Sequence, residues 1–153
     1  MRAGAVVAAL VGGPVSYTHL DVYKRQLLLA APTIATHGTQ EQIDLYVRDI
    51  VTGQKAWCQL FSEPQAGSDL AGLQTKAVKD GDEWIINGQK VWTSGGQYAD
   101  MGMLLARTNA EVPKHQGISY FAFEMHQDGV DVRPLKEMKM CIRDRSGPEP
   151  ALR

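Results

Sequence analysis

Hydrophobic and polar positions first become regular in the segment THGTQEQIDLYVRDIVTG, where apolar side chains recur at helical spacing. These positions are Ile43, Tyr46, Val47 and Ile50. Thr39 followed three residues later by Gln42 forms a capping box at the start, and Gly53 can adopt the left-handed conformation that ends a helix. The pattern predicts one amphipathic helix with a buried face.

After Gly53 the period changes from that of a helix to that of strands. Leu73–Lys79 alternates between apolar and polar residues, and Asp80–Gly81 supplies a turn. In WIINGQKVWT, Asn87–Gly88 lies between two β-branched and aromatic runs, which is a strong hairpin signal. Further strands are expected in MGMLLART, GISYFAFEM and GVDVRPL. We therefore expect a mainly β fold, a β sandwich or barrel from about residue 55 to 135, with one preceding amphipathic helix.

Length and composition narrow the class of protein. The chain has 153 residues, enough for one domain with a real core, and a formal net charge of -1 that favours neither nucleic acid nor an anionic membrane. No apolar run approaches the roughly 18 residues of a membrane-spanning helix. The apolar opening 1–13 imitates a secretory signal but has no clear small-residue cleavage site, so we expect a cytoplasmic protein. Cys58, Cys141 and the four histidines show no metal-ligand spacing, so we expect no metal site.

The segment WCQLFSEPQAGSD, residues 57–69, is the most informative part of the chain. It reads as an apolar strand that ends in a polar loop built from Pro64, Gly67 and Ser68. Such a loop exposes backbone N–H groups and hydroxyls, which suit a phosphate or the polar edge of a ring. The same residues are also typical of an ordinary connecting loop, and composition alone leaves both interpretations open.

With its neighbours, this segment resembles the acyl-CoA dehydrogenase family. The resemblance rests on FSEPQAGSDLAGLQTKA, on GDEWIINGQKVWTSGG, and on MGMLLART, GISYF and GVDVRPL, in that order. It covers Leu27 to about Met138. It implies that residues 27–54 are the end of an N-terminal helical domain. Residues 55–138 would then form most of a middle β domain that binds FAD and acyl-CoA.

The resemblance also assigns cofactor-binding residues. They are Gln59, Leu60, Phe61, Ser62, Gly67, Ser68, Trp92, Thr93 and Ser94. Ser62 would meet the pyrimidine edge of the flavin and Ser94 would lie near its hydride-accepting nitrogen, where fixed donors stabilise the charge gained on reduction. Ser68 would lie near both the pyrophosphate and the bound acyl-CoA. Trp92 would form a flat apolar wall, whereas Trp57 and Trp84 are expected to pack in the core.

The implied reaction is oxidation of an acyl-CoA thioester to the trans-2-enoyl-CoA, with hydride transfer to FAD, as in fatty acid β-oxidation. The family's catalytic base lies in a C-terminal helical domain, and Glu63 does not match it, so this chain has no catalytic residue and is expected to be inactive alone. The intact enzyme is expected to form a homo-oligomer and to pass electrons to an electron-transfer flavoprotein. An acyl-CoA oxidase fragment and a non-catalytic β-domain binding module stay open as alternatives.

Two stretches outside the resemblance have the character of translated sequencing adapter. DVYKRQ can be written GAT GTG TAT AAG AGA CAG, and VSYTHL can be written along the reverse complement of that word. MCIRDR can be written as the same word in another frame. The word looks like the transposon end that tags sequencing libraries. We therefore interpret residues 1–26 as a disordered, non-native leader with adapter and residues 139–153 as adapter with an unrelated tail, on a fragment of a longer gene.

Overall fold

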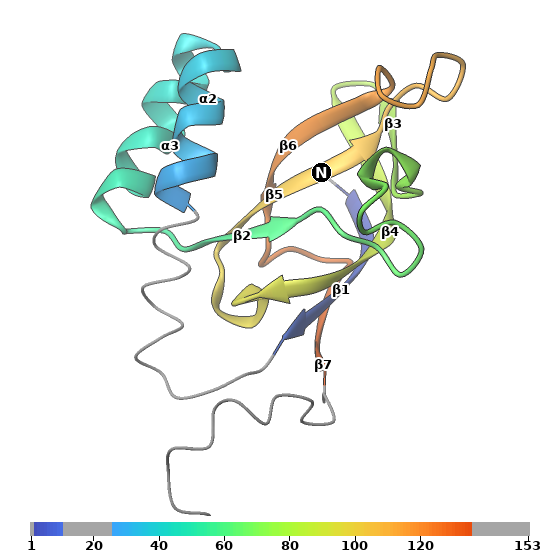
Figure 1. The fold of residues 1–153 in the computed structure, drawn as a ribbon. Coiled ribbons are helices and arrows are strands. Elements are labelled where there is room, and N and C mark those ends of the chain that lie inside the picture. Colours follow the sequence, from blue (N-terminus) through green and yellow to red (C-terminus); the bar gives the residue numbers. More distant parts are fainter. Residues whose placement is uncertain (1, 11–25, 136–153) are drawn as a thin grey trace, which may run out of the picture.

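The computed structural model describes residues 2–10 and 26–135, which form a mainly β fold with a few helices (Figure 1). The strands are β1 (Arg2–Leu10), β2 (Trp57–Leu60), β3 (Lys76–Asp80), β4 (Glu83–Ser94), β5 (Met101–Arg107), β6 (Ile118–Glu124) and β7 (Val130–Leu135). The helical elements are η1 (Gln26–Ala30), α2 (Ala31–His37), α3 (Gln40–Thr52), η2 (Leu70–Gly72) and η3 (Gly96–Tyr98). The expected fold class, mainly β with a preceding helix, is confirmed.

The seven strands form one connected sheet in the order β2-β5-β3-β4-β1-β7, with β6 paired to β5. The sheet curls around an apolar core, and strands from both ends of the strand order contribute side chains to this core. Leu60 of β2, Ile86 of β4 and Phe123 of β6 are buried there, and Val130 of β7 packs against them. Cys58 lies in the same core, where burial raises the pKa of its thiol to about 12. The curvature matters because it brings the end of β2 next to β4.

The helices pack against one side of the sheet through a second apolar cluster (Figure 1). Ile34 of α2 and Ile50 of α3 meet Trp57 of β2 and Met103 of β5. The predicted capping box is confirmed, because the Thr39 hydroxyl accepts from the N–H of Gln42 while the Gln42 side chain accepts from the Thr39 N–H. Within the described ranges, no helix is long and apolar enough to cross a membrane.

The turn predictions had different outcomes. The Asp80–Gly81 turn is confirmed: β3 and β4 form an antiparallel hairpin whose last pair is Asp80 with Glu83, and Gly81 has φ 60°. The Asn87–Gly88 hairpin is wrong, because β4 runs through both residues without turning. A Cβ at Gly88 would overlap the Thr75 hydroxyl and lie 2.7 Å from the Thr75 Cα atom. Gly88 therefore allows a close backbone approach rather than a turn.

Residues 2–10 of the predicted disordered leader are described as a strand, and the assignment of 1–26 to a leader stays a prediction. Arg2–Leu10 forms β1, which pairs in parallel with β4 on one side and with β7 on the other. Val6 and Val7 are β-branched and favour a strand, and β1 pairs with two strands that do not pair with each other. Residues 11–25 and 136–153 lie outside the described residues, and the adapter origin of the leader and tail stays a prediction.

Substituting Gly88 tests the close approach. We expect Gly88→Ala to lower the free energy of unfolding by about 1–3 kcal/mol, because the Thr75 backbone must move to admit the new methyl group. Urea titration followed by circular dichroism measures this. Gly67→Ala is the matched control, since no heavy atom lies within 4 Å of its Cβ position and the change should be nearly neutral. Equal stabilities for the two variants would contradict the close packing at Gly88.

Candidate functional site

The structure brings together the two stretches that the resemblance assigns to the flavin. The end of β2 and the residues after it run beside the second half of β4. The N–H of Val91 donates to the Ser62 carbonyl oxygen at 2.9 Å, and the Lys90 ammonium donates to the Phe61 carbonyl oxygen at 3.1 Å. Ser62 is thereby held next to the Trp92–Ser94 segment, although about 30 residues of chain separate them.

Trp92 has an unusual backbone conformation. Among the described non-glycine residues it alone has a positive φ, 60°, which is a genuine outlier for a bulky side chain. The pairing of β1 with β4 also shifts register here, from Val7 opposite Lys90 to Ala9 opposite Thr93. The irregularity leaves the Trp92 side chain 58% exposed. A conformation of this kind costs about 1–3 kcal/mol and is found where a strand must aim a side chain at a ligand.

The other assigned residues of β2 and β4 differ in what they can offer a ligand. Leu60 and Thr93 are completely buried, so their side chains belong to the interior. The Thr93 hydroxyl has no hydrogen-bond partner there. The side chains of Gln59, Phe61, Ser62 and Ser94 are half-buried. The hydroxyls of Ser62 and Ser94 are therefore the more accessible polar groups that flank Trp92.

The loop after β2 is tight and leaves Gly67 and Ser68 at the surface. Glu63 and Ala66 exchange two backbone hydrogen bonds, at 2.9 and 3.1 Å, which close the turn over Pro64 and Gln65. Gln65 stands where the family commonly has glycine, and its φ is not positive, so the turn accepts a side chain there without strain. Gly67 and Ser68 are both exposed, with open space around Gly67.

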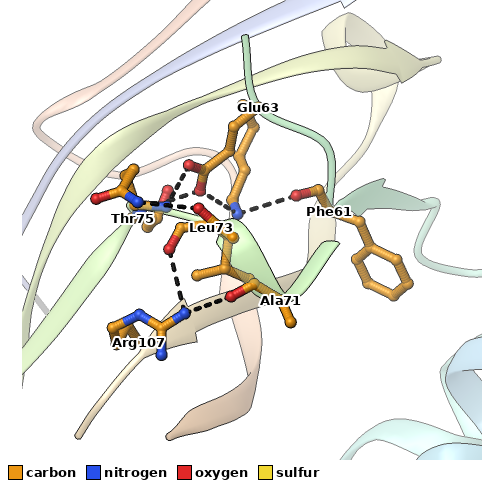
Figure 2. A network of polar contacts seen from close by, with 9 residues as sticks. Phe61, Glu63, Ala71, Leu73, Thr75 and Arg107 are labelled. Atoms are coloured by element: carbon orange, nitrogen blue, oxygen red, sulfur yellow. Dashed lines mark hydrogen bonds and ion pairs between the residues drawn. The ribbon is translucent and has the colours of Figure 1, made fainter. Parts of the chain in front are cut away.

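Glu63 holds the beginning of this loop in place (Figure 2). Its Oε1 atom accepts from the Lys90 ammonium at 2.8 Å and from the Thr75 N–H at 3.0 Å, while Oε2 accepts from the Gln74 N–H. Burial favours the protonated acid, but these donors outweigh it and hold the pKa of the carboxyl below its ordinary value. Burial also lowers the pKa of Lys90, an effect that the carboxylate of Glu63 opposes. The two side chains form a buried ion pair.

Arg107 holds the other end of the loop (Figure 2). Its guanidinium donates to the carbonyl oxygens of Ala71 at 2.6 Å and Lys114 at 3.2 Å. An exposed ion pair of 2.8 Å between Lys114 and Asp69 links the same two loops, and the hydrogen bond from Lys114 lowers the pKa of Asp69. Both ends of the segment that carries Gly67 and Ser68 are therefore fixed by charged side chains.

Sequence reasoning missed Lys90 and did not see the role of Glu63. A signal was present, because Lys90 has the same parity along β4 as the buried Ile86, which places it on the inward face. A lysine on that face needs an acidic or carbonyl partner. Trp57 and Trp84 behave as expected: Trp57 is buried against the ring of Tyr46 and Trp84 packs edge-to-face on Phe121.

The structure also has a cavity of about 490 Å³. It is lined by η3 and the β6–β7 turn, including Gln97, His126 and Asp128. None of the residues that the resemblance assigns to FAD lines it. The residues assigned to FAD lie along β2, β4 and the loop after β2, and Trp92, Gly67 and Ser68 among them are exposed.

Comparison with known proteins shows the family of the chain. The family model "Acyl-CoA dehydrogenase, middle domain" matches residues 58–146, more than half of the chain. The acyl-CoA dehydrogenase FadE34 of Mycobacterium tuberculosis is 54% identical over 109 residues, which cover 71% of this chain and 15% of the relative. The match to the family model runs past Met138 into the predicted adapter.

Solved structures show the same fold. An acyl-CoA dehydrogenase from Geobacillus kaustophilus superposes with a TM-score of 0.68 at 38% identity, covering 72% of this chain and 28% of that one. A glutaryl-CoA dehydrogenase from Mycobacterium smegmatis, solved in complex with FADH2, gives a TM-score of 0.58 at 32% identity, covering 66% and 25%. The chain spans less than a third of each of these proteins. It belongs to the acyl-CoA dehydrogenase family.

Proposed function

We propose that this chain is part of a flavin-dependent acyl-CoA dehydrogenase and that its β sheet supplies one side of the FAD site. The observation that carries the proposal is the pairing of Ser62 with Val91, which puts a hydroxyl-bearing strand end beside an exposed Trp92 with φ 60°. A flat aromatic wall flanked by hydroxyls fits a flavin, whose ring is apolar on its faces and polar at its edge. FAD, when bound, supplies the acceptor for a hydride.

The residues divide by the part of the cofactor that they would hold. Trp92 would stack on the ring, and Ser62 and Ser94 would bind its polar edge, with Gln59, Leu60, Phe61 and Thr93 forming the strands that carry them. Gly67 and Ser68 would offer an N–H and a hydroxyl to the pyrophosphate, and Ser68 also to the acyl-CoA. These groups bind and orient, and fixed donors at the ring edge stabilise the negative charge that reduction brings.

No described acidic residue in the loop motif is suited to remove the α-proton of an acyl-CoA. Glu63 is buried, bonded to Lys90 and to two backbone N–H groups, and has a lowered pKa. A general base must reach the substrate proton and have a pKa near the working pH, and Glu63 does neither. We therefore assign no catalytic residue to this chain and expect the base on a part of the parent protein that it does not contain.

The helix pair supports the division into domains. η1 and α3 carry large apolar residues that are exposed: Leu28, Leu29, Leu45 and Val51. Exposed apolar side chains on a helix pair are typical of an element that packs against further helices. Residues 27–54 would thus be the end of a helical domain, and residues 55–138 the middle β domain.

For the intact protein we propose the partners that the relatives suggest. Similar solved structures include a ChsE4–ChsE5 complex from Mycobacterium tuberculosis and an electron transferring flavoprotein of Acidaminococcus fermentans. An oligomer that passes electrons to an electron-transfer flavoprotein is consistent with both, and acyl-CoA is the substrate class. An oxidase would use the same binding residues and differ in whether oxygen reaches the reduced flavin.

Titration with FAD tests the proposal. We expect the full chain to quench flavin fluorescence and shift the flavin absorption bands, because the ring passes from water to the indole wall. An unchanged flavin spectrum with a chain that melts cooperatively would contradict the proposal and favour a non-catalytic binding module.

The contribution of Trp92 can be measured in the same titration. We expect Trp92→Ala to raise the Kd for FAD about tenfold, or ~1.4 kcal/mol, since it removes one aromatic stacking partner. Val78→Ala on β3 is the control, because Val78 is 60% exposed like Trp92 but lies outside the site, and its Kd should be unchanged. Equal Kd values for Trp92→Ala and the unaltered chain would place the flavin elsewhere.

The missing base gives a separate prediction. When an acyl-CoA is added anaerobically to the FAD-loaded chain, we expect the absorption band of oxidised flavin to persist, because no group removes the α-proton. The spectrum is followed by absorption over hours, with dithionite as a positive control for reduction. Bleaching by acyl-CoA alone would show that this chain does carry a base.

A further inference from the structure

Lys90 joins three parts of the candidate site from inside the sheet. Its ammonium group donates to the Phe61 carbonyl oxygen at 3.1 Å and to Glu63 Oε1 at 2.8 Å, and both of its partners lie at the end of β2 (Figure 2). The side chains of Lys90 and Glu63 are only 2% and 3% exposed. Lys90 lies two residues before Trp92 on β4, and Phe61 and Glu63 flank Ser62.

Stability alone does not account for a pair of this kind. Removing two charges from water is costly, and an apolar pair of similar volume often stabilises a protein as well or better. Apolar contacts have no preferred direction, so an apolar pair cannot hold one particular carbonyl oxygen and one carboxylate at fixed distances. Hydrogen bonds to a buried ammonium are directional and strong, so they fix one position of β2 relative to β4.

The fixed position bears directly on the ligand surface. Three consecutive residues, Phe61, Ser62 and Glu63, accept hydrogen bonds from β4. Lys90 donates to the first and the third, and the Val91 N–H donates to the second. On the far side of Glu63, the N–H groups of Gln74 and Thr75 bond to the same carboxylate and close the segment that carries Gly67 and Ser68. One buried pair thus touches both the strand ends and the loop.

We propose that Glu63 and Lys90 are positioning residues for the flavin site, which set the spacing between Ser62 and Trp92 and hold the Gly67–Ser68 loop. This rests on the proposed function. Neither side chain reaches a ligand from its buried place, and both act through the backbone that they hold. A purely structural pair would change the melting temperature and the affinity for FAD together, whereas a positioning pair changes the affinity even where stability is regained.

Two variants separate these roles. Lys90→Met leaves the Glu63 carboxylate buried without its ammonium partner, so the melting temperature should fall. In Glu63→Gln/Lys90→Met no net charge is buried, and the Gln carbonyl can still accept from the Thr75 N–H, so part of that loss should be regained. We expect the double variant to keep a Kd for FAD at least tenfold above that of the unaltered chain. Its flavin absorption shift should also be smaller, because the Phe61 carbonyl oxygen loses its bond to the Lys90 ammonium and Ser62 keeps only the backbone bond from Val91.

Glu63→Asp and a surface control complete the experiment. Glu63→Asp keeps the charge but draws the carboxylate back by one methylene, so it should fold even if the Lys90 variants do not and should still weaken FAD binding. Lys79→Met makes the same change as Lys90→Met at an exposed position of β3 and should leave both readouts unchanged.

The outcomes distinguish the two proposals. If the unaltered chain binds FAD and every folded variant of the pair binds it equally well, the pair is only structural and the inference is overturned. The inference is equally overturned if affinity returns to its full value together with the melting temperature in the double variant. If the unaltered chain itself leaves the flavin spectrum unchanged, the proposed function is contradicted, and the inference that rests on it is overturned with it. Weakened binding by a variant that melts near the temperature of the unaltered chain supports the inference.

Discussion

The contact between the end of β2 and the second half of β4 is the constraint on which the candidate site depends. It joins segments that are far apart in the chain through the Val91–Ser62 backbone bond and the two bonds of the Lys90 ammonium. It sets Ser62, which follows β2, beside the part of β4 that carries Trp92. The curled sheet makes the contact possible, and the buried charge of Glu63 makes it specific.

The charged side chains nearest to this contact have partners within the described residues. Each charged group near it is used internally: Glu63 with Lys90, Asp69 with Lys114, and Arg107 with backbone carbonyls. The surface that we propose for a flat, polar-edged cofactor consists of the exposed Trp92 ring, the half-buried Ser62 and Ser94, and the exposed Gly67–Ser68 loop. We propose that this domain binds the cofactor and that another part of the larger enzyme supplies the base.

Local sequence rules predicted the elements well where no distant residue intervened. The capping box at Thr39, the left-handed Gly53 and the turn at Gly81 all follow from nearby residues. The rule failed at Asn87–Gly88, because the glycine serves the approach of Thr75, which local sequence does not show. The resemblance assigned residues at the ends of both strands, β2 and β4, to the flavin. It did not identify the buried pair that holds them, and no propensity rule predicts a positive φ for Trp92, since tryptophan is rarely found there.

The central claim is that FAD meets the surface formed by the ends of β2 and β4, and residue-resolved NMR tests it most directly. In a titration of the isotope-labelled chain with FAD, the amide signals of Ser62, Gly67, Ser68 and Trp92–Ser94 should shift most. The indole N–H of Trp92 should move with them, while the buried indole of Trp57 should not. Shifts concentrated at Gln97, His126 and Asp128, around the separate cavity, or no shifts at all in a folded chain, would contradict the account.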